Sequence, residues 1–138
     1  MSRNSTSAKI VAHKFNKHFT VEEAEALLPF ILSVFEQVQA LREEMAAFRD
    51  DLQRVHEAAP GNGGDAKGTT LVEFSETIGR LLKTLDDKGI LVKDIEGGII
   101  DFPHLREDRE VLLCWRMGEK TVSYWHDLDA GYRGRQPL

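Results

Sequence analysis

The sequence predicts an α+β domain in which a long antiparallel helical hairpin precedes a small antiparallel β-meander of about four strands. Two apolar stripes recur at spacings of three and four residues, from Ile31 to Val55 and from Leu71 to Leu85, which is the period of packed helices. After Gly89 the pattern changes to short apolar runs separated by glycine turns, which is typical of strands. Helices that precede all the strands favour an α+β class over an alternating α/β class.

The domain boundaries follow from the charge pattern. We expect residues 1–19 to form a basic, mobile tail and residues 20–138 to form one domain, with helices over 20–88 and a β-rich part over 90–138. Residues 20–138 carry 14 basic and 23 acidic side chains, a balance of −9. The tail has four basic residues and no acid: Arg3, Lys9, Lys14 and Lys17.

Composition excludes several classes of protein. The acidic body opposes nucleic-acid binding, which depends on lysine and arginine to neutralise phosphates. No run approaches the roughly 18 apolar residues of a membrane span, and the N-terminus lacks the apolar stretch of a secretion signal. A single cysteine, Cys114, cannot form an internal disulfide. We therefore expect a cytoplasmic protein without a nucleic-acid or membrane partner, and we expect no cofactor.

The first helical signal is the capping box Thr20-Val21-Glu22-Glu23, which predicts a helix start at this point. Pro29 follows about two turns later, where proline deletes a hydrogen bond and clashes with the preceding turn. We therefore expect a short helix, a break, and a main helix that begins at Pro29 or Phe30, because proline is favourable at a first helical position. Up to Val55 this helix has 27 residues, or about 40 Å.

The second helix is predicted from Leu71 to Leu85, with Gly89 as its C-terminal cap. The glycine-rich segment 59–68 is expected to be a flexible turn between the two helices. It is not a phosphate-binding P-loop, because its lysine is followed by Gly68 and the loop follows a helix instead of a strand.

The first helix has more apolar surface than a two-helix hairpin can bury. Eight large side chains, at about 1.5–3 kcal/mol each for full burial, represent on the order of ten to twenty kcal/mol that requires a partner surface. They are Ile31, Val34, Val38, Leu41, Met45, Phe48, Leu52 and Val55. Part of that surface is the sheet, and the rest predicts a homodimer through the helices. Parallel self-pairing would set Glu44 near Arg49 of a second chain.

Four strands are predicted after Gly89, as a meander with one face on the helices. Pro103 is expected to end the second strand, and residues 104–109 to form a charged loop. The predicted strands are 91–95, 99–102, 111–117 and 121–126. In the third strand Trp115 is expected on the core side, and Trp125 is expected to be core in the fourth.

Several separated blocks carry a resemblance that runs from His18-Phe19-Thr20 to the C-terminus. The blocks are Val92-Lys93-Asp94, Asp101-Phe102-Pro103, Arg109-Glu110-Val111, Leu113-Cys114-Trp115-Arg116, Trp125-His126, Asp129-Ala130-Gly131 and Gly134-Arg135-Gln136-Pro137. In these blocks the chain resembles the uncharacterised bacterial proteins grouped as domain of unknown function 2203. The resemblance implies no assigned activity and no catalytic residue. His104 departs from the pattern, since the proteins it resembles often have a small residue there.

Five polar residues of the β-rich part are candidates for binding a ligand or partner: Asp101, Arg116, His126, Asp129 and Arg133. In an enzyme His126 would be the general base, oriented by Asp127 or Asp129, and Arg116 or Arg133 would stabilise an anion. Cys114 could be a nucleophile only beside His126, and a buried small hydrophobe is the expected alternative.

An alternative metal site would combine Asp101, His104, His126 and Asp129, a set suited to zinc or iron. The i,i+3 spacing within each pair has no ligand meaning on a strand, so a satisfied surface histidine is the competing interpretation. The tail around Arg135 is expected to pair with Asp127 and Asp129 and hold the C-terminus, or else to bind an anion.

The function remains unknown from sequence. The favoured interpretation is a non-enzymatic interaction or accessory protein that uses the aromatic and charged surface of the sheet. The alternative is a small-ligand-binding or metal-dependent enzyme with a site at Asp101, Arg116, His126 and Asp129. A cluster of these four side chains around an accessible pocket would favour the enzyme, and dispersal would favour the interaction protein.

Overall fold

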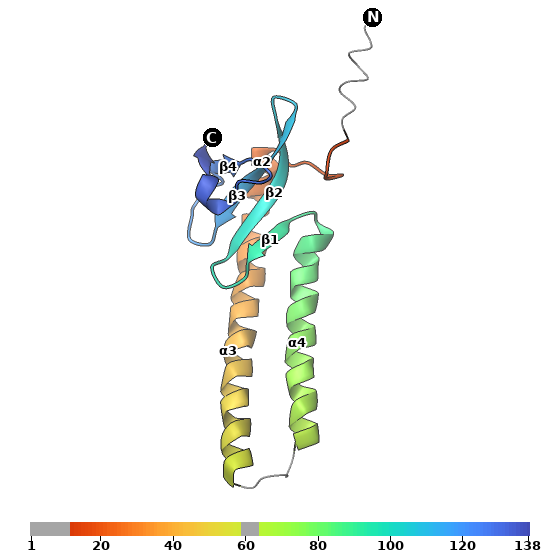
Figure 1. The fold of residues 1–138 in the computed structure, drawn as a ribbon, viewed down its shortest axis with the longest axis vertical. Coiled ribbons are helices and arrows are strands. Elements are labelled where there is room, and N and C mark those ends of the chain that lie inside the picture. Colours follow the sequence, from red (N-terminus) through yellow and green to blue (C-terminus); the bar gives the residue numbers. More distant parts are fainter. Residues whose placement is uncertain (1–11, 59–63) are drawn as a thin grey trace, which may run out of the picture.

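The computed structural model describes residues 12–58 and 64–138, with side chains for residues 12–56 and 70–138. Figure 1 shows two long helices side by side, with the sheet at one end of the pair. The elements are α2 (Val21–Ala26), α3 (Leu28–Ala58), α4 (Gly64–Asp87), β1 (Leu91–Asp94), β2 (Ile99–Arg106), β3 (Arg109–Arg116), β4 (Tyr124–His126), the 3-10 turn η1 (Tyr132–Gly134) and β5 (Gln136–Pro137). The predicted α+β class is confirmed, with five strands instead of about four.

The capping box begins α2 as predicted. The Thr20 hydroxyl accepts from the Glu23 backbone N–H at 3.0 Å, and the Glu23 carboxylate accepts from the Thr20 N–H at 2.9 Å. The main helix begins at Leu28, one or two residues before the predicted start at Pro29 or Phe30. Pro29 therefore lies in the first turn of α3, where its missing N–H would have no helical acceptor.

The second long helix is longer than predicted. It begins at Gly64 instead of Leu71, so the helix includes the last five residues of the predicted turn 59–68, and residues 59–63 lie outside the described part. Its C-terminus has the predicted cap: Gly89 has a φ of +87°, its N–H donates to Asp86 at 2.9 Å, and the Ile90 N–H donates to Leu85 at 3.1 Å. These two bonds form a Schellman motif. Among the described helices, none is long and apolar enough to cross a membrane.

All five strands are antiparallel neighbours in chain order, from β1 to β5. The prediction that Pro103 ends the second strand is wrong, because β2 continues to Arg106 and Pro103 pairs with Leu112. The Pro103 carbonyl accepts from the Phe19 N–H at 2.7 Å. Since N–H and C=O of one residue point to the same side of a strand, the proline nitrogen also points away from β3, and its missing hydrogen removes no bond from the β2–β3 ladder.

The predicted charged loop 104–109 is a tight hairpin instead. Arg106 pairs with Arg109, which leaves a two-residue turn at Glu107 and Asp108. Both have positive φ, 52° and 65°, which matches the twist that two-residue hairpins prefer. The first half of the predicted loop is therefore strand, and β2 and β3 are eight residues each.

The fourth strand is shorter than predicted, and a fifth strand was missed. β4 covers only Tyr124–His126 of the predicted 121–126. The two-residue strand β5 pairs with it, Tyr124 opposite Pro137 and Trp125 opposite Gln136. The C-terminus is thus tied to the sheet edge, where the Leu138 N–H also donates to the Ser123 carbonyl at 2.9 Å.

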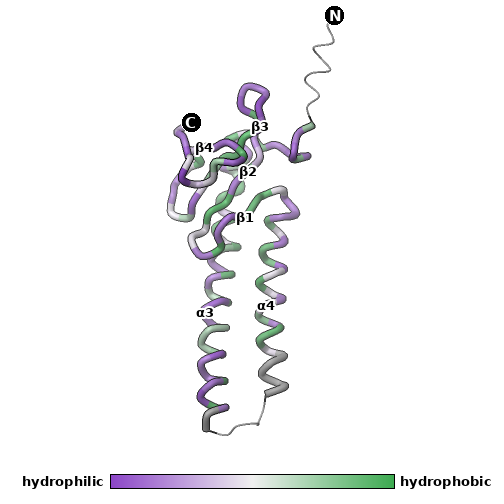
Figure 2. Tube along the Cα trace, in the orientation of Figure 1, coloured by the Kyte–Doolittle hydropathy of each residue, from purple (hydrophilic) through white to green (hydrophobic). Residues whose placement is uncertain are grey.

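The core lies between the sheet and the end of the helix pair that contacts it. Its largest members include Phe35, Phe102, Trp115 and Trp125, so both tryptophans are core as predicted. Figure 2 shows hydrophobic residues concentrated on the central strands, whereas the end of α3 remote from the sheet is mostly hydrophilic. The buried residues of α3 are Ile31, Val34, Phe35 and Val38.

The remaining length of the helix pair, residues 39–56 of α3 and 70–84 of α4, is called the stalk below. None of its described side chains is buried. The helices still contact each other along it, for example through the Phe48 and Phe74 rings, whose centroids are 6.1 Å apart. A two-helix stalk therefore projects from a packed α+β head.

The N-terminal segment is attached to the head from residue 14 onward. The Glu110 carboxylate accepts from the Lys14 and Phe15 N–H groups at 2.8 and 3.0 Å, and it contacts His18 Nε2 at 2.8 Å. Burial raises the pKa of Glu110, but the bonds from His18, Lys14 and Phe15 outweigh it and leave the pKa below the usual range. Of the predicted tail 1–19, residues 14–19 thus contact the sheet, and residues 1–11 lie outside the described part.

Candidate functional site

The strand register brings candidate residues together on the face of the sheet turned away from the helices. Cys114 lies opposite Asp101 on β2 and opposite Tyr124 on β4. His126 lies opposite Leu112, two residues from Cys114 on β3. Side chains alternate between the two faces of a strand, and Phe102, Leu113 and Trp125 belong to the core. Their chain neighbours Asp101, Cys114 and His126 therefore point to the opposite face.

The centre of this face is a buried pair of Asp101 and His126. His126 Nε2 lies 3.0 Å from Asp101 Oδ2, and both side chains are 1% exposed. The other ring nitrogen, Nδ1, lies 2.7 Å from the Asp127 carbonyl oxygen. Lys93 Nζ is 3.5 Å from the same Asp101 oxygen. Asp101 and His126 are thus the two predicted site residues that the fold joins directly.

Both ring nitrogens of His126 therefore face oxygen atoms: Nδ1 faces a carbonyl oxygen, which only accepts, and Nε2 faces a carboxylate oxygen. The other carboxylate oxygen, Asp101 Oδ1, is buried and accepts no hydrogen bond of normal geometry.

Cys114 is the third member of the cluster. Its sulfur and one ligand atom each of Asp101 and His126 lie within 4.8 Å of one another. Burial raises the pKa of the Cys114 thiol to about 12. The Asp101 charge adds to this effect, and Arg135 acts against it. The thiol is therefore protonated at neutral pH. His126 has no free nitrogen for it, because both face other groups, so a cysteine nucleophile with a histidine base has no support in this geometry.

The other candidates are dispersed. Arg116 is exposed, with Nη1 3.5 Å from the Tyr132 hydroxyl. Asp129 and Arg133 are exposed, and neither belongs to the cluster of Asp101 and His126. A groove of about 780 Å³ at the β2–β3 hairpin is lined by residues such as His13, Lys14 and Arg109, and by none of the five candidates.

The predicted metal set is not assembled. His104 is three residues from Asp101 on one strand, so the two side chains point to opposite faces. Its Nδ1 lies 2.6 Å from the Phe19 carbonyl oxygen, and Asp129 stands in an exposed turn. The sequence interpretation missed Cys114 as the third member, because only the β2–β3 register places residue 114 beside residue 101.

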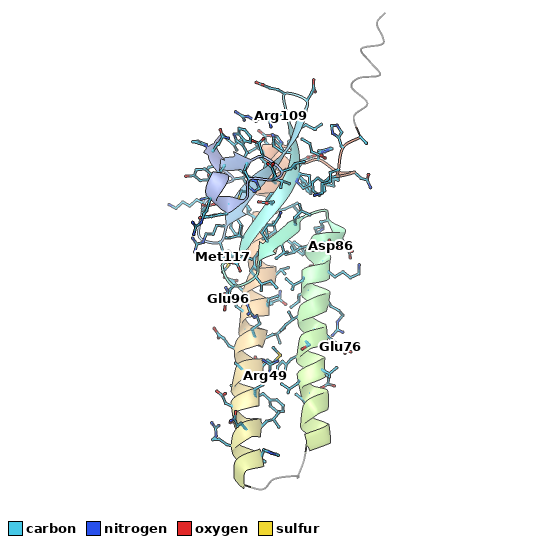
Figure 3. All side chains as sticks on the ribbon, viewed as in Figure 1. Arg49, Glu76, Asp86, Glu96, Arg109 and Met117 are labelled. Carbon is cyan, nitrogen blue, oxygen red and sulfur yellow. The ribbon has the colours of Figure 1, made fainter. Side chains whose placement is uncertain are left out.

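The C-terminal segment crosses this face and is held by Arg135. Its guanidinium lies 4.2 Å from the Tyr124 ring centroid and 4.1 Å from that of Tyr132. It donates to Glu119 Oε2 at 2.8 Å and to the Tyr132 hydroxyl at 3.2 Å. The partner acid is Glu119, not the predicted Asp127 or Asp129. Asp127 pairs instead with Arg109, labelled near the hairpin in Figure 3.

Replacing Arg135 with alanine should lower the free energy of unfolding by about 2 kcal/mol, because a charge-assisted hydrogen bond and two ring contacts are lost. Urea denaturation measures this change in the free energy of unfolding. Arg133→Ala is the matched control: the same residue type, two positions away and exposed, should change the free energy by less than about 0.5 kcal/mol. Equal stability of the two variants would contradict the assigned role of Arg135.

Fold and site together define a small α+β protein with a helical stalk and a buried Asp–Cys–His cluster closed by its own C-terminus. A family model described as "Uncharacterized conserved protein (DUF2203)" matches residues 17–138. The chain belongs to that family, which confirms the resemblance. No curated protein and no solved structure matches it.

Proposed function

We propose that this protein is a non-enzymatic cytoplasmic interaction or accessory protein, and that the stalk binds a second copy of the chain. The observation that carries the proposal is the absence of any buried residue among the described side chains of the stalk. Residues 39–56 alone extend for about 27 Å at the helical rise. Only the base of the stalk packs against the core, through Ile78, Leu81 and Leu82. A pair of helices that contact only each other is marginally stable, so the remaining length of the stalk favours a partner.

The state of the candidate residues supports a non-enzymatic role. Asp101 and His126 are inaccessible to solvent, and both nitrogens of His126 already have partners. Arg116, Asp129 and Arg133 do not join them. The aromatic side chains that the sequence suggested as a partner surface are in the core or stacked on Arg135. We therefore place the interaction surface on the stalk instead of the sheet.

One face of the stalk carries a groove beside α3. Met45, Ala46 and Arg49 line this groove of about 520 Å³ together with Glu96 of the head. The Ser75 hydroxyl of α4 lies 3.8 Å from the Met45 sulfur. Helical spacing sets Val72 and Gly79 on the same side of α4 as Ser75. Figure 3 labels Arg49 on α3 and Glu76 on α4 for orientation.

Two residues of this face are unusual for a helix exposed to water. Val72 is 53% exposed, more than the other exposed large hydrophobic residues. Gly79 lies inside α4, and a Cβ built on it would contact nothing within 4 Å. An exposed glycine in a helix costs about 1 kcal/mol relative to alanine, but it permits another helix to approach closely. Both features fit a face that packs against a second stalk.

The charge of the stalk allows a second copy to bind. Residues 39–56 contain three arginines and four acids, and residues 70–84 contain two basic and two acidic residues, a balance of −1. By comparison, residues 20–138 have a balance of −9. Two stalks therefore repel each other little. The apolar stripe of α3 faces α4 of the same chain. The predicted pairing of Glu44 with Arg49 of a second chain requires two α3 stripes in contact, so it is not part of the proposed interface.

Val72→Lys should weaken dimerisation by at least about tenfold, because each copy loses the burial of an apolar side chain worth about 1.5 kcal/mol. Sedimentation equilibrium measures the dissociation constant, and circular dichroism verifies that the helices remain. Leu105→Lys is the matched control, since Leu105 is also an exposed large hydrophobe, 38% exposed, but lies in strand β2 of the head. Equal dissociation constants for both variants would overturn the proposed surface.

A further inference from the structure

The cluster under the C-terminal segment contains three side chains that bind transition metals. Asp101, Cys114 and His126 come from the neighbouring strands β2, β3 and β4. They offer a carboxylate oxygen, a sulfur and an imidazole nitrogen within 4.8 Å of one another, and all three residues are buried. Carboxylate, thiolate and imidazole are the donor types found in zinc sites.

Two observations indicate that the centre of this cluster suits a cation. His126 Nε2 and Asp101 Oδ2, both potential ligand atoms, are 3.0 Å apart, and the contact of Nδ1 with the Asp127 carbonyl oxygen at 2.7 Å leaves Nε2 as the nitrogen directed into the cluster. Asp101 Oδ1 is buried and accepts no hydrogen bond of normal geometry, although the Cys114 thiol interacts with the same carboxylate, whereas buried carboxylate oxygens normally accept one. A cation between the three side chains would satisfy both the nitrogen lone pair and the carboxylate.

We infer that Asp101, Cys114 and His126 bind one divalent transition-metal ion, zinc being the ion that fits this donor set best. The site is independent of the proposed stalk interface. On binding, the Cys114 thiol proton leaves for solvent, His126 binds as a neutral imidazole through Nε2, and one thiolate and one carboxylate balance the two charges of the ion. Three protein ligands leave the fourth tetrahedral position for a water molecule or another oxygen.

The surroundings of the cluster support metal binding. The Nδ1–H contact with the Asp127 carbonyl orients the ring in the way typical of metal-bound histidines. Lys93, which approaches Asp101 to 3.5 Å, has a side chain 45% exposed and can move into solvent when the ion takes its place. Because the three ligands join adjacent strands, the ion would stabilise the sheet.

A second group of potential ligands, His13, His18 and Glu110, serves as the internal comparison. Its carboxylate is already saturated: Oε1 accepts from Lys14, and Oε2 accepts from Phe15 and contacts His18. No orphaned oxygen points into this group. We therefore assign the ion to the buried cluster and use His18 as the control position.

The test uses the full chain, stripped with a chelator and titrated with Zn²⁺ or Co²⁺ alone. We expect one ion per chain and a Co²⁺ spectrum with the charge-transfer band of a cobalt thiolate. Cys114→Ser should abolish the band, and His126→Gln should lower the Zn²⁺ affinity by more than about 100-fold. His18→Gln should leave band and affinity unchanged.

Two results would overturn the inference. One is a stripped wild-type chain that binds no stoichiometric ion or gives a Co²⁺ spectrum without the thiolate band. The other is binding that survives Cys114→Ser but is lost in His18→Gln. The Co²⁺ spectrum of the wild-type chain reports the thiolate ligand by itself, even if the Cys114 or His126 variant fails to fold.

Discussion

Asp101→Ala should lower the free energy of unfolding of the metal-free protein by about 3–5 kcal/mol. Removing one partner of a buried pair leaves the other group without compensation, and here it leaves His126 Nε2 without its partner beside Lys93. A domain of this kind has about 5–15 kcal/mol of total stability, so the variant should be close to unfolding at ambient temperature. Urea denaturation in the presence of a chelator measures the change.

Two further variants make this prediction specific. Asp94→Ala removes a carboxylate from the neighbouring strand β1, where it is exposed, and should cost less than about 0.5 kcal/mol. Asp101→Asn should cost less than Asp101→Ala, because its amide can donate to the lone pair of a neutral His126 Nε2. If Asp101→Ala costs no more than Asp94→Ala, the buried pair does not stabilise the sheet.

Phe102→Ala should also cost about 3–5 kcal/mol, through the loss of buried area and the cavity left behind. Phe102 is fully buried, and its ring packs edge-on against Phe19 with centroids 5.3 Å apart. The Phe19 backbone N–H donates to the Pro103 carbonyl, and the Phe19 carbonyl oxygen faces His104 Nδ1. The substitution should therefore also loosen the attachment of the N-terminal segment, which hydrogen exchange of the Phe15 and Phe19 amides reports.

Phe30→Ala is the matched control for the core substitution. Its ring is exposed and contacts Lys88 instead of the core, so we expect a loss of less than about 1 kcal/mol in urea denaturation. Comparable losses for Phe102→Ala and Phe30→Ala would mean that the interface between sheet and helices is not the principal core.

The parts of the fold with strong local signals could be predicted from the sequence. The capping box at Thr20 and the cap at Gly89 are local hydrogen-bond patterns, and both form as expected. The period of three and four residues predicted the long helices, because it reflects one face of a single element. The predicted ends of these helices were less accurate. The helix α4 begins seven residues before Leu71, because the small and polar residues 64–70 extend the helix without adding to its apolar stripe.

The errors concern contacts between distant segments. Pro103 ends a strand by local rules, but its nitrogen faces the edge where Phe19 binds, so the strand continues. β5 is two residues long and exists only because β4 offers an edge to it. The grouping of Asp101, Cys114 and His126 depends on the register of three strands, and a shift of one residue would have sent Cys114 into the core instead.

The most direct test of the central claim is the mass of the intact chain in solution, measured by light scattering at micromolar and higher concentrations. Self-association through the stalk predicts twice the chain mass of 15.6 kDa at the upper end of the range, with a return toward the chain mass in Val72→Lys. A wild-type mass of 15.6 kDa at every concentration would contradict the account.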